Sequence, residues 1–158
     1  MRAGIVAVMA ALVAAPLGAQ AFVFAPVTQA EAHAVAVGGA HGGVLAGVGA
    51  NRPAGYYVRV GALAAAGVAT GPTTGTAARV AATARFLADP FREGRWGAYA
   101  GSGVVVDWWP GAHGRAALEL MAGADLPART TWRPAIELGV GNGVRLSLVF
   151  RQIGRAHV

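Results

Sequence analysis

The side chains that could take part in catalysis are few, and they do not form a recognised catalytic pattern. A nucleophilic mechanism needs a nucleophile beside a base, an acid that orients the base, and donors that stabilise an oxyanion. Two neighbouring strands of a closed sheet would bring His33 and Ser147 to one face, with Glu31 as the local acid. Neither a G-x-S-x-G elbow nor an H-E-x-x-H motif occurs, so we expect no enzymatic activity. The eligible residues are His33, His41, His113, Ser102, Ser147 and Asp107.

Metal and cofactor sites are not expected either. Cysteine is absent, and no two histidines have the spacing of a metal site. His41 and His113 lie in glycine-rich segments that are typical of solvated turns.

The charged residues follow a more regular pattern, because they recur on one parity of alternating segments. On either side of Asn142-Gly143, one parity is apolar and the other holds the charges. A period of two is that of a β-strand, and Asn-Gly between two such runs predicts a tight hairpin. A soluble sheet would turn the charged face to water, whereas a membrane barrel would turn it to the lumen. From the third run onward this face holds Arg59, Arg79, Arg85, Asp107, Arg115, Glu119, Arg133, Glu137, Arg145 and Arg151.

Eight alternating runs follow one another, separated by short segments rich in glycine and proline. Such connections are typical of hairpins, and the runs are near the length that crosses a bilayer obliquely. The alanine content of 77–87 would also allow a helix, but the Val/Thr/Phe alternation favours a strand. We therefore predict an all-β fold, an eight-stranded antiparallel up-and-down barrel. The runs are Gln29–Val37, Val44–Asn51, Gly55–Ala69, Ala77–Ala88, Trp96–Trp108, Gly114–Ala124, Trp132–Gly141 and Val144–Arg151.

The charged face of such a barrel predicts a lumen filled by paired side chains. An eight-stranded barrel has an interior just wide enough for side chains, and glycines on the same parity leave room for arginine and tyrosine. Buried charges must be paired, so we expect no open pore. Seven arginines against three acids in the strands predict a positive excess, and Glu137 is the expected central acceptor. In a meander, Arg115 and Glu119 should lie beside Arg133 and Glu137, and these beside Arg145. The predicted ion-pair network is Arg59, Arg79, Arg115, Glu119, Arg133, Glu137 and Arg145.

Aromatic residues of the apolar parity gather at the ends of the predicted strands. At one rim they are Tyr56, Phe86, Trp96, Trp132 and Phe150, and at the other rim Trp108. Girdles of this kind mark the interfaces of membrane barrels. Aromatic packing at the open end of a soluble barrel is the alternative.

The two ends of the chain differ from the rest. Residues 1–21 combine Arg2, an apolar stretch and Ala19-Gln20-Ala21, which together predict a cleaved signal peptide and export. Residues 153–158 break the alternation and match the translation of a common sequencing adapter, so we interpret them as a scar. The single predicted domain is 22–152.

The composition narrows the class of protein. The 158 residues are 55% hydrophobic and only 13% charged, yet no apolar run is long enough for a membrane-spanning helix. All 13 basic residues are arginines, and they are spread along the chain. Nucleic-acid binding normally requires a clustered basic surface, so a nucleic-acid partner is not expected.

With its leader and eight alternating strands, the chain resembles the small eight-stranded outer-membrane barrels, the OmpA- and OmpX-like class, over about Gln29 to Arg151. Its last run, with Leu146, Leu148 and Phe150, is similar to the terminal strand that the barrel-assembly machinery reads in that class. The resemblance implies an outer-membrane location, lipid as a partner, and a structural or surface role. A soluble periplasmic β-barrel or sandwich that binds an apolar ligand or a protein partner is the alternative.

Overall fold

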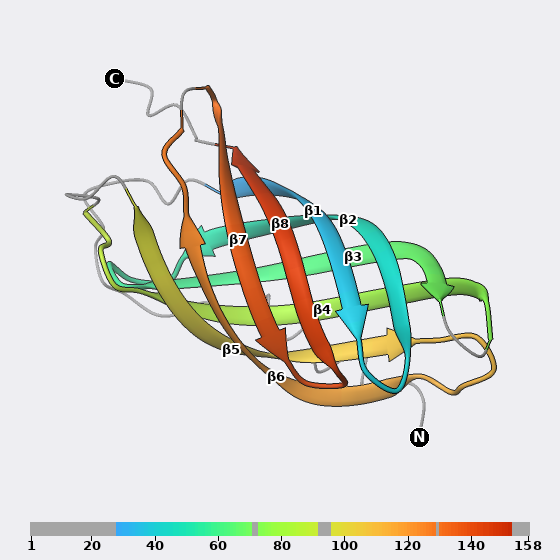
Figure 1. Cartoon of the computed structure of the whole chain (residues 1–158). Coiled ribbons are helices and arrows are strands. Elements are labelled where there is room, and N and C mark those ends of the chain that lie inside the picture. The colour runs from blue at the N-terminus through green and yellow to red at the C-terminus, as the bar shows by residue number, and fades with distance from the viewer. Residues whose placement is uncertain (1–27, 71–72, 92–95, 129, 153–158) are drawn as a thin grey trace.

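The computed structural model describes residues 28–70, 73–91, 96–128 and 130–152. The predicted signal peptide and the predicted tail lie outside these residues. Eight strands form one closed antiparallel barrel in sequence order, with β1 paired to β8, and this confirms the predicted fold (Figure 1). The strands are β1 (Gln29–Gly38), β2 (Gly42–Pro53), β3 (Val58–Thr70), β4 (Gly75–Leu87), β5 (Gly97–Trp108), β6 (Arg115–Asp125), β7 (Trp132–Val140) and β8 (Val144–Gln152).

The connections define two ends of the barrel. The hairpin end holds the β1–β2 turn at 39–41 and the β7–β8 turn at 141–143. In the latter, Val140 pairs with Val144 and Gly141 N donates to Gly143 O at 3.0 Å, so the predicted hairpin forms with a three-residue turn that includes Gly141 as well as Asn142-Gly143. The terminal end is where β1 begins and β8 ends, and it holds the connections at 54–57, 88–96 and 126–131.

Inward and outward side chains alternate along every strand, as the parity predicted. In β8, for example, Arg145, Ser147, Val149 and Arg151 are buried while the residues between them are exposed. Two glycines make the interior possible. A Cβ on Gly123 would lie 2.6 Å from the Tyr99 ring, and one on Gly139 would lie 2.2 Å from Glu119 Oε1. These positions therefore leave the space that the long inward side chains occupy.

The apolar part of the interior lies toward the hairpin end, and we call it the apolar lumen layer. Trp109, which directly follows β5, folds inward and is 5% exposed, whereas Trp108 points outward. His41 from the β1–β2 turn stacks on Trp109 with ring centroids 5.9 Å apart. The aromatic pair thus closes this end over the rest of the layer, which is Val35, Val37, Leu45, Leu63, Ala65, Ala69, Ala77, Ala81 and Val105.

The outer face of the barrel is mostly apolar, and many of its large side chains are exposed. Leu118 is 77% exposed, Val48 70% and Leu120 67%. Large hydrophobic side chains are exposed in this way on every strand from β2 to β8. Among the described residues, no helix is long and apolar enough to cross a membrane.

Candidate functional site

The candidate site is the polar part of the lumen, which we call the lumenal network. Its ionisable side chains come from β1 and from the five strands β4 to β8, and inward parity places each of them. They are Glu31, His33, Arg79, Arg85, Asp107, Glu119, Asp125, Glu137, Arg145 and Arg151, all at most 5% exposed.

Glu137 on β7 is one centre of the network. Its Oε1 accepts from Tyr99 Oη at 2.9 Å and lies 2.7 Å from Arg151 Nη2 and 3.2 Å from Arg85 Nη2. Its Oε2 lies 3.3 Å from Arg145 Nη1. Three arginines and a tyrosine thus share one carboxylate, which is the role expected of Glu137.

Glu31 on β1 is a second centre that the sequence prediction missed. Its Oε1 accepts from Arg151 Nε at 2.6 Å, Arg85 Nη1 at 2.9 Å and Asn51 Nδ2 at 3.0 Å. Its Oε2 lies 3.3 Å from His33 Nε2. Arg85 and Arg151 therefore bridge two carboxylates on β1 and β7, the two strands that flank β8, and Arg85 reaches them across the lumen from β4. Parity had already placed both arginines on the charged face, and this could have been used to include them in the predicted ion-pair network.

A third group of contacts runs from the middle of the lumen toward the hairpin end. Glu119 pairs with both Arg79 and Arg145, and Arg79 Nη1 lies 3.0 Å from Asp107 Oδ1. Asn142 in the β7–β8 turn donates to Asp107 Oδ2 at 3.0 Å. The network is thereby tied to the hairpin turn.

At the terminal end, Arg151 has a further set of partners. It pairs with Asp125, and its guanidinium carbon lies 4.7 Å from the centroid of the Tyr99 ring. This distance is typical of a cation–π contact. Arg59 on β3 donates to Gln29 and Asn51 near the same end.

Two expectations about the network are wrong: that Arg115 belongs to it, and that Arg115 and Glu119 lie beside the pair on β7. Arg115 is exposed and lies opposite Asp107 at the hairpin end, whereas Arg133 lies opposite Arg151 at the terminal end. Arg115 and Glu119 are therefore not beside Arg133 and Glu137. The register pairs Glu137 with Gly123, because neighbouring strands of a closed barrel are staggered, and parity carries no information on stagger. Arg133 is partly buried, and its Nε has no hydrogen-bond partner.

The positive excess is smaller than predicted. Glu31 and Asp125 bring the inward strand carboxylates to five against the same seven arginines, and among the buried residues alone four arginines face five carboxylates. Parity counting began at the third run and so left out Glu31, and it assigned Asp125 to a loop although β6 ends on that residue. The three remaining inward arginines lie near the ends of their strands, where water can reach them.

The pair considered for catalysis does not assemble. His33 and Ser147 are both buried on adjacent strands, but Ser147 Oγ accepts from Arg145 Nη1 and His33 Nε2 faces Glu31. Val35, not His33, is the register partner of Ser147. Across the described part of the chain, no group of three or more His, Asp or Glu side chains is placed to hold a metal ion.

The six residues of the predicted girdle are all exposed on the outer side. Tyr56, Phe86, Trp96, Trp132 and Phe150 lie at the terminal end and are 39–64% exposed, and Trp108 at the hairpin end is 44% exposed. Tyr57 and Phe91, which the girdle prediction did not include, pack with Phe86 and Tyr56; the Tyr57 and Phe86 rings stack at 5.6 Å. That these rings meet a membrane interface remains a prediction.

Comparisons with known proteins bear on the fold. No protein-family model and no curated protein matches the chain. The crystal structure of Neisserial surface protein A matches with a TM-score of 0.53 and 15% identity, covering 80% of this chain and 96% of that one. The N-terminal β-barrel domain of Pseudomonas aeruginosa OprF matches with a TM-score of 0.50 and 12% identity, covering 80% and 99%. The resemblance predicted from the alternation is therefore confirmed at the level of fold.

Proposed function

We propose that the chain is a small outer-membrane β-barrel with a structural or surface role and a lumen filled by side chains. The proposal rests on one observation: which side chains point into the barrel and which point out of it. Charged side chains such as Glu137 and Arg145 are buried inside the barrel, while leucines such as Leu118 and Leu120 cover its outside. Lipid is the solvent in which that arrangement is favourable.

A soluble periplasmic barrel that binds an apolar ligand is less well supported. Such a barrel needs an apolar cavity inside and a polar outside. Here the lumen is crossed by ion pairs, and its apolar layer is closed by Trp109. An apolar outer face of this extent would also promote aggregation in water.

The same arrangement argues for a barrier and against a pore. The contacts of Arg79, Arg85, Arg145 and Arg151 extend from Asp107 near the hairpin end to Asp125 at the terminal end. Ions would have to break these contacts to pass. We therefore expect no large and stable single-channel currents in a planar bilayer, and such currents would contradict the filled lumen.

The partners in this proposal are lipid and, during biogenesis, the barrel-assembly machinery. The outward residues of β8 are Val144, Leu146, Leu148 and Phe150, and they give the last strand a continuous apolar outer face. No enzymatic role is proposed, because the serine and histidine on β8 and β1 are engaged with Arg145 and Glu31.

Cell fractionation tests the location. The full chain, expressed in a Gram-negative host, should sediment with the outer membrane and resist extraction by alkaline carbonate. Recovery in the soluble periplasmic fraction would favour the soluble alternative.

A further inference from the structure

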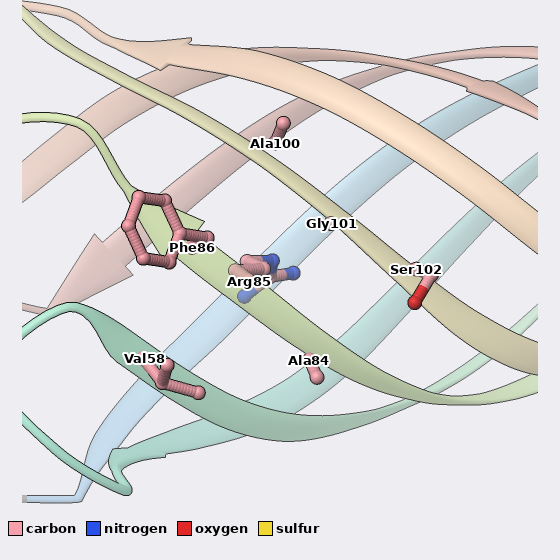
Figure 2. A pocket seen from close by; sticks show the side chains of 7 residues that line it. All are labelled: Val58, Ala84, Arg85, Phe86, Ala100, Gly101 and Ser102. Atoms are coloured by element: carbon pink, nitrogen blue, oxygen red, sulfur yellow. The ribbon is translucent and has the colours of Figure 1, made fainter.

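The outer wall of the barrel is uneven, and one part of it carries a hollow. On β6 to β8 the outward residues include Leu118, Leu120 and Leu138, whereas on β3 to β5 eight of the nineteen outward residues are alanine. A hollow of about 430 Å³ lies on that alanine-rich part, near the terminal end (Figure 2). Its lining is Val58, Ala84, Arg85, Phe86, Ala100, Gly101 and Ser102.

The chemistry of the hollow is set by two of its residues. The Arg85 guanidinium is engaged inside the lumen with Glu31 and Glu137, so it offers no charge to the outer side. Ser102 is exposed on the outer face, and none of the described residues forms a hydrogen bond with its hydroxyl. The polar group that the hollow presents is therefore this one hydroxyl.

Ser102 is unusual for its position. Among the described outward residues, the other polar ones are at or next to the end of a strand: Arg52, Thr70, Thr76 and Gln152. Ser102 lies in the middle of β5, far from either rim. In lipid, water does not reach that depth, and hydrocarbon chains cannot accept or donate a hydrogen bond. The hydroxyl therefore favours a protein surface over an acyl chain as the occupant of the hollow.

We infer that a second copy of this chain docks on the hollow, with a two-fold axis along the membrane normal close to Ser102. A two-fold interface is self-complementary, so it places like positions near one another across the axis and gives each Ser102 hydroxyl a partner. The small side chains of Ala84 and Ala100 allow close approach of the two walls, as small residues do between packed membrane helices. Phe86 projects beside the hollow and is 57% exposed, so its ring can enter the hollow of the other copy.

This inference rests on the proposed location in lipid, and one set of samples tests both. Because the chain contains no cysteine, single cysteines report on chosen sites alone. The full chain carrying Ser102→Cys is folded into phosphatidylcholine vesicles at low protein-to-lipid ratio and oxidised with copper phenanthroline. Leu138→Cys, which is exposed on β7, is the matched control. Insertion is scored separately, as resistance to alkaline carbonate.

A docked pair holds the two Ser102→Cys thiols at high effective concentration. Disulfide-linked dimer should therefore form at least about tenfold faster than with Leu138→Cys, and its rate should change little as lipid is added. Adding Ala84→Leu to Ser102→Cys fills the hollow and should slow the reaction toward the control. Equal rates for the two cysteines in carbonate-resistant vesicles would overturn the dimer while leaving the membrane location intact. Extraction of the protein by carbonate would overturn both.

Discussion

The two faces of the barrel wall solve opposite solvation problems with the same strands. Inside, Glu31 and Glu137 each contact three or more polar side chains at 2.6–3.3 Å. Outside, Leu118 and Leu120 lie one residue away from buried Glu119 and are more than two-thirds exposed. A soluble barrel would reverse this arrangement. Under the proposed location, lipid outside and ion pairs inside are two parts of one requirement, since neither face would be stable in the place of the other.

The largest effect is expected from breaking the inner face at Glu137. Replacing Glu137 by Gln removes the charge shared by Arg85, Arg145 and Arg151. Loss of one member of a buried pair costs about 3–5 kcal/mol, because its partners stay buried and uncompensated. Urea unfolding in lipid vesicles measures the change. Arg115→Gln is the control; it is exposed on the same face and should cost no more than about 1 kcal/mol. Equal costs for the two variants would mean that water fills the lumen.

Trp108 and Trp109 compare the two faces at adjacent positions. Trp109→Ala removes the side chain that closes the apolar lumen layer, and truncation of a buried tryptophan costs about 3–5 kcal/mol. Trp108→Ala should cost clearly less, because that ring is 44% exposed and lipid or water replaces its contacts. The difference between the two unfolding free energies checks this. If both variants lose the same stability, Trp109 does not close the apolar lumen layer.

The outer face is tested by placing a charge on it at two depths. Leu118→Arg should cost about 2–4 kcal/mol if the site is near the midplane of the bilayer. Thr76→Arg points outward beside the start of β4, where the same charge should cost about 0–1 kcal/mol. Folding yields and unfolding midpoints in vesicles provide the comparison. A Leu118→Arg protein as stable as its parent would argue against lipid on this face.

Much of the fold could be predicted from the sequence because the signal is local. Alternation sets which side chains share a face, and Asn142-Gly143 sets a turn, without knowledge of any distant residue. Strand limits were less certain. The third strand starts at Val58 and not at Gly55, since Tyr56 and Tyr57 belong to the turn and pack with Phe91 and Phe86.

The network could be predicted only in part, because its partners depend on long-range geometry. Parity identified the inward arginines and the acceptor role of Glu137. It did not give the stagger that separates Arg115 from Arg133, which depends on how the sheet closes. Glu31 was missed as a centre because the charged face was counted only from the third run onward, and no local signal pointed to its partners. Its partners Arg85 and Arg151 are distant in sequence, and they meet it only across the lumen or across the β1–β8 closure.

The most direct test of the central claim measures what surrounds the outer face. A nitroxide attached to a single cysteine at Leu120→Cys, in the full chain folded into lipid vesicles, should collide more often with apolar oxygen than with a water-soluble nickel chelate. The same label at Arg115→Cys, near the hairpin end, is expected to reverse that preference. A label at position 120 that meets the nickel chelate as often as one at position 115 would contradict a lipid-facing wall.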